Sequence, residues 1–176
     1  MDFIFFKLKL KVAWFKLTRR LSHSNEIVDF KISQIDNSAV LIVFPFNKNQ
    51  FKSEIKYIYE IIDTLVERNV SITIIINSIY KDSIKLYDID IHIIETNNKG
   101  SMKNISSILN QIYLKNFNFV IDLNSPFNID LAMLINELKS NYKIGFKSDF
   151  SDLFYNIQLK RNQKKNGYTI IKDMLS

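Results

Sequence analysis

Short apolar runs that alternate with helical patterns are the feature that most constrains the fold of this chain. Residues 39–44 read Ala-Val-Leu-Ile-Val-Phe, which is typical of a strand buried on both faces of a sheet. Further strands are predicted at 70–76, 89–94, 117–123, 142–146 and 155–159, with 89–94 and 155–159 at sheet edges. Between them, apolar residues recur at helical spacing, and Ser125 and Pro126 fit the N-cap and the first position of the last helix. The sequence therefore predicts one Rossmann-like α/β domain over residues 25–159, with a doubly wound, mostly parallel sheet and 40–44 as a central strand.

Cysteine and histidine are scarce, and this limits the chemistry that the chain can perform. The 176 residues contain no cysteine, which excludes disulfides, thiolate metal sites and cysteine nucleophiles. The two histidines, His23 and His92, have no carboxylate at metal-ligand spacing. The sequence therefore predicts no metal site and identifies no catalytic residue, and it predicts His92 to be a surface or packing residue of an edge strand.

Positive charge is concentrated at the two ends of the chain. Residues 1–22 have a net charge of +5 and residues 160–176 one of +4, which leaves −3 for the rest of a chain with +6 in total. Such asymmetry suggests an anionic surface as partner. A membrane is favoured over a nucleic acid, because the acidic body has no basic face and no nucleic-acid-binding motif. Residues 160–176 are predicted to be a basic C-terminal tail that could hold a short helix.

Residues 1–24 are predicted to form a basic amphipathic helix. An apolar stripe with spacings near 3.6 runs along it, made of Phe3, Phe6, Leu10, Ala13, Trp14, Leu17 and Leu21, whereas Phe5, Leu8, Val12 and Phe15 fall on the basic side. The apolar segments are too short for a bilayer span or a signal peptide. We expect the helix to lie in the plane of an anionic membrane surface, bound through Lys7, Lys9, Lys11, Trp14, Lys16, Arg19 and Arg20. The alternative is that the stripe packs against the sheet of the chain itself or against a partner subunit.

A ligand of a doubly wound sheet binds beyond the carboxyl ends of the strands, where the strand order reverses. For the commonest order this point lies between the strands at 39–44 and 117–123, whose following loops, 45–49 and 122–128, both contain Pro-Phe-Asn. The candidate ligand-binding residues there are Asn47, Lys48, Asp122 and Asn124. The alternative is that the asparagines cap helices and set turns, and that Asp122 caps a helix rather than acting in acid–base chemistry. The first loop lacks the glycines of a dinucleotide site or a P-loop, so no nucleotide cofactor is predicted.

The segment 117–123, Phe-Asn-Phe-Val-Ile-Asp-Leu, followed by a helix and by Lys-Ile-Gly-Phe at 143–146, resembles the N-terminal, acceptor-side half of glycosyltransferase family nine. These are the heptosyltransferase-like enzymes of lipopolysaccharide assembly. The strand at 39–44 with its Pro45 loop is also similar to the opening strand of that family, and the resemblance covers about residues 39–157. In the family, the activated-sugar donor binds mainly to a second, C-terminal domain, and a carboxylate in the loop after the first strand is implicated as the base. The matching stretch here, Phe46-Asn-Lys-Asn-Gln50, has no carboxylate, so the resemblance is to a truncated and degenerate member.

The resemblance implies a heptosyltransferase-like domain at the cytoplasmic face of the inner membrane that is not catalytic alone. Its ligand would be a sugar or a lipid-linked sugar, and a partner chain would have to supply the donor site. The alternative function is a non-enzymatic peripheral membrane or protein-interaction module on a Rossmann-like scaffold. A fold by itself does not decide between these functions.

Overall fold

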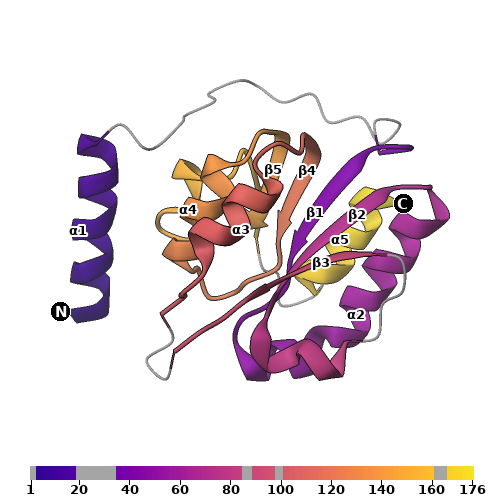
Figure 1. Ribbon diagram of the computed structural model, residues 1–176, viewed down its shortest axis with the longest axis horizontal. Coiled ribbons are helices and arrows are strands. Elements are labelled where there is room, and N and C mark those ends of the chain that lie inside the picture. Colours follow the sequence, from indigo (N-terminus) through magenta and orange to yellow (C-terminus); the bar gives the residue numbers. More distant parts are fainter. Residues whose placement is uncertain (1–2, 19–34, 85–88, 98–100, 161–165) are drawn as a thin grey trace.

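A single six-stranded parallel sheet forms the centre of the molecule. The computed structural model describes residues 3–18, 35–84, 89–97, 101–160 and 166–176 (Figure 1). The strands are β1 (Ala39–Val43), β2 (Ser71–Asn77), β3 (Asp90–Ile94), β4 (Phe117–Asp122), β5 (Ser140–Phe146) and β6 (Ile157–Leu159). Their order in the sheet is β3-β2-β1-β4-β5-β6, and each neighbouring pair is parallel. This order confirms the predicted doubly wound sheet and the central position of residues 40–43.

Helices cover both faces of the sheet. The helices α2 (Lys48–Glu67) and α5 (Gly167–Leu175) lie on one face, and α3 (Ile105–Ile112) and α4 (Ile129–Glu137) lie on the other (Figure 1). Two short 3₁₀ helices follow strand ends, η2 (Ser78–Ser83) after β2 and η3 (Ser151–Leu153) after β5. The helices thereby separate water from a sheet whose central strands are apolar on both sides.

The alternation of side chains along β1 divides the core into two layers. Val40 and Ile42 face α2 and α5, whereas Leu41 and Val43 face α3 and α4, and all four side chains are fully buried. Because successive strand residues point to opposite faces, an unbroken apolar strand supplies both layers at once. Asn69, with φ of 54°, ends α2 in the left-handed conformation that asparagine tolerates, and the chain then turns into β2.

Two predicted boundaries are wrong. Ser125 is not the N-cap of α4, since the chain continues as a loop to Asn128, whose side chain accepts hydrogen bonds from the backbone N–H groups of Asp130 and Leu131. Residues 166–176 are not a tail outside the domain, because α5 packs on α2 with Tyr168 and Leu175 fully buried. The prediction of a tail rested on the net positive charge of residues 160–176 and overlooked the apolar face of this helix.

The N-terminal helix α1 (Phe3–Leu17) lies beside α4, on the α3 and α4 side of the sheet (Figure 1). Its Val12 is buried and Phe15 packs against the same apolar cluster as α4. The Nζ atom of Lys11 lies 2.5 Å from Oδ1 of Asp130 in the first turn of α4. Residues 19–24 of the predicted helix, including Arg19, Arg20 and Leu21, lie outside the described residues. Within the described ranges, no helix has the length and hydropathy needed to cross a bilayer.

Candidate functional site

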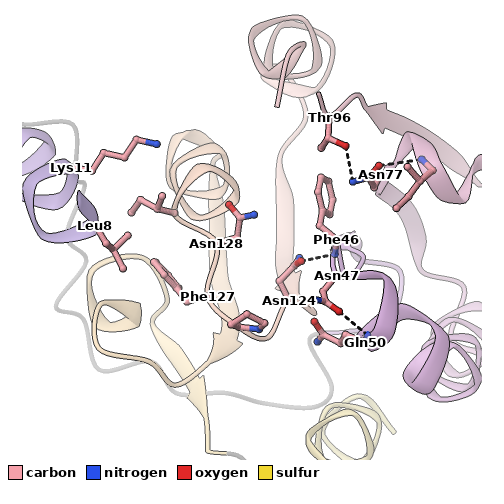
Figure 2. Close-up of a pocket in the computed structure, with 13 residues that line it drawn as sticks. Leu8, Lys11, Phe46, Asn47, Gln50, Asn77, Thr96, Asn124, Phe127 and Asn128 are labelled. Carbon is pink, nitrogen blue, oxygen red and sulfur yellow. Dashed lines mark hydrogen bonds between the residues drawn. The ribbon is translucent and has the colours of Figure 1, made fainter. Parts of the chain in front are cut away.

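The two Pro-Phe-Asn loops meet where the strand order reverses. β1 pairs with β4 at the centre of the sheet, so the loop of Phe46 and Asn47 and the loop of Phe127 and Asn128 leave neighbouring strands at their carboxyl ends. In an open parallel sheet this is the point at which ligands bind. Figure 2 shows residues of both loops around one cavity.

The cavity has a volume of about 660 Å³, which lies within the range of small-molecule sites. Its uncharged polar groups come from Asn47, Gln50, Asn77, Thr96, Asn124 and Asn128. Its apolar wall is made of Leu8, Phe46, Ile79, Pro126, Phe127 and Ile129, and Lys11 adds one cation. Leu8 and Lys11 belong to α1, which closes one side of the cavity, while Asn77 and Thr96 lie on the opposite side (Figure 2).

Two of the asparagines cap helices, as the alternative interpretation of the sequence holds. The Oδ1 of Asn47 accepts from the backbone N–H groups of Asn49 and Gln50 at the start of α2, and Asn128 does the same for α4. For both Asn47 and Asn128 the Nδ2 group has no hydrogen-bond acceptor among the described residues. Each side chain therefore fixes its loop through its oxygen and keeps two N–H donors for a ligand.

Asn124 fixes the two loops relative to each other. Its Oδ1 accepts from the backbone N–H of Phe46 at 2.7 Å, and its Nδ2 donates to the carbonyl oxygen of Phe44 at 3.0 Å and to Oδ1 of Asp122 at 2.7 Å. The residue is 6% exposed. All polar atoms of its side chain are bonded within the protein, so Asn124 shapes the cavity wall rather than offering a free group.

Asp122 lies behind this wall and does not line the cavity. Its Oδ2 accepts a hydrogen bond of 2.5 Å from the hydroxyl of Tyr155, and its Oδ1 accepts from the backbone and side chain of Asn124. Burial raises the pKa of Asp122 above its usual range, against the opposing effect of these hydrogen bonds. Burial and the Asp122 charge together raise the pKa of Tyr155 well above its ordinary value. Both groups are placed as a buried structural pair rather than as an acid and a base facing a substrate.

Gln50 joins the C-terminal helix to the cavity. Its Nε2 donates to the carbonyl oxygen of Leu123 and to the hydroxyl of Tyr168, at 2.9 and 2.7 Å, and its Oε1 accepts from the backbone N–H of Ser125. The Tyr168 hydroxyl also donates to the Leu123 carbonyl oxygen, at 2.7 Å. This buried network holds the loop after β4 against α2 and α5.

Of the four candidate ligand-binding residues, the structure brings Asn47 and Asn124 to the cavity. Lys48 lines a separate cavity of about 560 Å³ between α2 and η2, and Asp122 is enclosed. The sequence pattern missed several wall residues, namely Gln50, Asn77, Thr96, Phe127 and Asn128. Phe127 and Asn128 could have been found from the repeated Pro-Phe-Asn tripeptide. Asn77 could have been found because it directly follows a predicted buried strand.

Among the described residues that line the cavity, none has a carboxylate or an imidazole. The described residues also contain no group of three or more potential metal ligands. His92 lies on the edge strand β3, where its ring nitrogens are 3.0 Å from Asp90 and 2.9 Å from Gln111. The cavity can therefore bind through hydrogen bonds and apolar contact, but it holds no side chain suited to accept a proton from a nucleophile.

The structure places the candidate membrane-binding residues on different sides of α1. Lys9, Trp14 and Lys16 are exposed, and Lys11 is paired with Asp130 at the cavity. The side chain of Lys7 and the residues Arg19 and Arg20 are not among those described.

The fold is shared with a glycosyltransferase of known structure. The glycosyl transferase family 9 protein from Veillonella parvula superposes with a TM-score of 0.58 over 80% of this chain and 41% of that chain, at 12% sequence identity. The chain thus spans less than half the length of that protein. No protein-family model matches the chain, and no curated protein matches its sequence. The similarity shows that the two proteins share a Rossmann-like α/β fold.

Proposed function

We propose that the chain is a glycosyltransferase-like, acceptor-side domain that binds a sugar-bearing ligand at the cytoplasmic face of a membrane and does not transfer a glycosyl group alone. The observation that carries the proposal is the amide-lined cavity at the reversal point of the sheet. The fold shared with a glycosyl transferase family 9 protein supports the same class of ligand.

The chemistry of the cavity fits an uncharged polyol. Sugar hydroxyls both donate and accept hydrogen bonds, and an amide Nδ2 such as that of Asn47 or Asn128 is a neutral donor to them. The rings of Phe46 and Phe127 give apolar surfaces against which the C–H face of a sugar ring can lie. Among the described residues of the wall, a phosphate or carboxylate ligand would meet one cation, Lys11, whose Nζ is already paired with Asp130.

Glycosyl transfer needs a group that accepts the proton of the attacking hydroxyl. The wall of the cavity, in the part of the chain that the structure describes, offers no such group, and the nearby carboxylate of Asp122 is sequestered with Tyr155 and Asn124. Binding without turnover is the activity that this arrangement supports. Groups from outside the described residues would have to take part in any reaction.

Binding can be tested with a panel of free monosaccharides, alkyl glycosides and nucleotide sugars, by isothermal titration and by NMR shifts. We expect sugars and alkyl glycosides to bind the wild-type chain. The double variant Asn47→Ser/Asn128→Ser keeps the capping oxygens but removes both Nδ2 groups, so it should bind at least about tenfold more weakly, which corresponds to roughly 1.4 kcal/mol. Asn166→Ser is the matched control, since Asn166 caps α5 away from the cavity.

Several results would overturn the proposal. Sugar binding that is unchanged in the double serine variant would place the ligand elsewhere. Release of sugar from a nucleotide sugar by the purified chain would contradict the claim that it is not catalytic alone. Failure of every sugar in the panel to bind would favour the alternative function, an interaction module without a sugar ligand.

A further inference from the structure

Helix α1 has apolar residues on two sides, and only one of them contacts the body of the protein. Val12 is 5% exposed and Phe15 packs against the cluster that includes α4. Leu8 on the same side lines the cavity, and Lys11 pairs with Asp130. Their positions, 8, 11, 12 and 15, follow the i, i+3, i+4, i+7 pattern of one face of a helix.

The opposite side carries the predicted apolar stripe, and the structure leaves the described large side chains of that stripe uncovered. Phe6, Leu10, Trp14 and Leu17 are 47%, 56%, 60% and 77% exposed. They make up four of the eight exposed large apolar side chains among the described residues, and all four lie on one side of one helix. The alternative that this stripe packs against the sheet of the same chain does not hold for its described residues, because Leu8, Val12 and Phe15 lie on the side that meets the body. A concentration of this kind marks a surface that binds something.

The charge around the stripe indicates whether it binds a second copy of the chain or an anionic lipid surface. Lys9 and Lys16 are exposed and fall beside the stripe on the helical wheel, within a segment, residues 1–22, that carries +5 while the body carries −3. A second copy of the chain docked on the stripe would bring the same lysines together, which is unfavourable. An anionic lipid surface is complementary to them, and lysine stems can lie along the apolar boundary while their ammonium groups reach the headgroups.

The length of α1 sets its orientation. Its 15 described helical residues span about 22 Å, less than the roughly 30 Å of a bilayer hydrocarbon core. A tryptophan and a phenylalanine on an apolar face bordered by lysines are typical of a helix that lies in the interface.

We infer that the stripe Phe6, Leu10, Trp14 and Leu17 is a docking surface for an anionic membrane, on which α1 lies in the plane of the interface. The same helix walls the cavity with Leu8 and Lys11, so docking would hold the cavity beside the lipid headgroups. This inference rests on the proposed function, which places the protein at a membrane, and it names the surface that makes the membrane contact. The vesicle experiment below contains no sugar, and the sugar titrations contain no lipid, so each can fail independently.

Trp14 is the only tryptophan of the chain, and its fluorescence reports on the stripe directly. Titration with phosphatidylcholine vesicles that contain phosphatidylglycerol should shift its emission to shorter wavelength and carry the protein into the pellet on sedimentation. Pure phosphatidylcholine vesicles should bind much less, and sodium chloride should weaken binding to the anionic vesicles. The variant Leu10→Glu/Leu17→Glu, which keeps the reporter, should lose at least about tenfold in vesicle affinity.

Tyr113→Glu/Leu114→Glu is the matched control, since these two residues are 52% and 88% exposed on the body after α3. It should bind vesicles as the wild type does, and circular dichroism should show that both double variants are folded. Equal vesicle affinity of the stripe variant and the control would overturn the inference. So would a concentration-dependent dimer that the stripe substitutions abolish, because a second copy of the chain would then be the occupant. Binding that is indifferent to phosphatidylglycerol and to salt would contradict the role of charge.

Discussion

The hydroxyl of Tyr155 lies 2.5 Å from Oδ2 of Asp122, and both side chains are buried. The Tyr155 ring reaches this position by lying over Gly145 of β5, where it occupies the space that a side chain would need. Asp122 in turn accepts a hydrogen bond from the side chain of Asn124, and that side chain is hydrogen-bonded to the backbone of Phe44 and Phe46. The shape of the cavity therefore depends on a buried carboxylate that does not line it.

The Asp122 carboxyl should make stability depend on pH. Its pKa is raised in the folded state above the ordinary value of 3.8, so the folded protein holds this proton more tightly than the unfolded chain does. The stabilisation that this tighter proton binding gives to the folded state is fully present below pH 3.8. It is lost as the pH rises through the raised pKa of Asp122 in the folded protein. Asp122→Asn cannot titrate, and it keeps an oxygen for Asn124 and an N–H group toward Tyr155. Denaturant unfolding over a pH series should show the wild type losing free energy of unfolding relative to this variant as the pH rises. A difference that does not change with pH would contradict the prediction.

Gly145→Ala should destabilise the fold by about 1–3 kcal/mol, because overpacking forces the neighbouring group to move. A Cβ atom at position 145 would lie 2.7 Å from two carbons of the Tyr155 ring. Urea unfolding measures the loss. In a Tyr155→Leu background the same substitution should cost less, and a double-mutant cycle isolates the difference. Equal costs in the two backgrounds would show that the ring is not the obstacle.

Asn124→Ala should lower the free energy of unfolding by about 2–4 kcal/mol, since it leaves buried partners without hydrogen bonds. These partners are the backbone groups of Phe44 and Phe46 and the carboxylate of Asp122. Asn47→Ala, which removes an exposed helix cap, should cost only about 1 kcal/mol. Thermal or urea unfolding of the two variants provides the comparison. The reverse ranking would mean that the buried network contributes less than one cap.

Tyr168→Phe should cost about 1–2 kcal/mol, because its hydroxyl donates to Leu123 and accepts from Gln50 in the core. Tyr113→Phe serves as the control, since Tyr113 is 52% exposed and should be close to neutral. Urea unfolding distinguishes the two. Equal effects would contradict the proposed link between α5 and the cavity.

The sheet could be predicted because buried parallel strands are continuous apolar runs, which local sequence displays directly. The position of the cavity followed from strand order, so the loops of Asn47 and Asn124 were predicted together. The role of Gln50 could not be predicted, because its hydrogen bond to Tyr168 joins residues that are 118 positions apart in the sequence. The exposed stripe of α1 was visible as a periodicity, but Leu8, Val12 and Phe15 were placed on the basic side, and periodicity does not indicate which side of a helix meets the protein. The start of α4 was misplaced because both Ser125 and Asn128 are good capping residues, and only the backbone path decides between them.

Amide groups neither gain nor lose protons in the physiological range, and this bears on how the cavity responds to pH. Apart from Lys11, no described residue on its wall titrates, so its pattern of donors and acceptors stays constant wherever the protein is folded. The proposed docking of α1 on a membrane depends instead on counterions and lipid charge. In that proposal, a change in ionic strength moves the protein between membrane and solution without altering the groups that line the cavity.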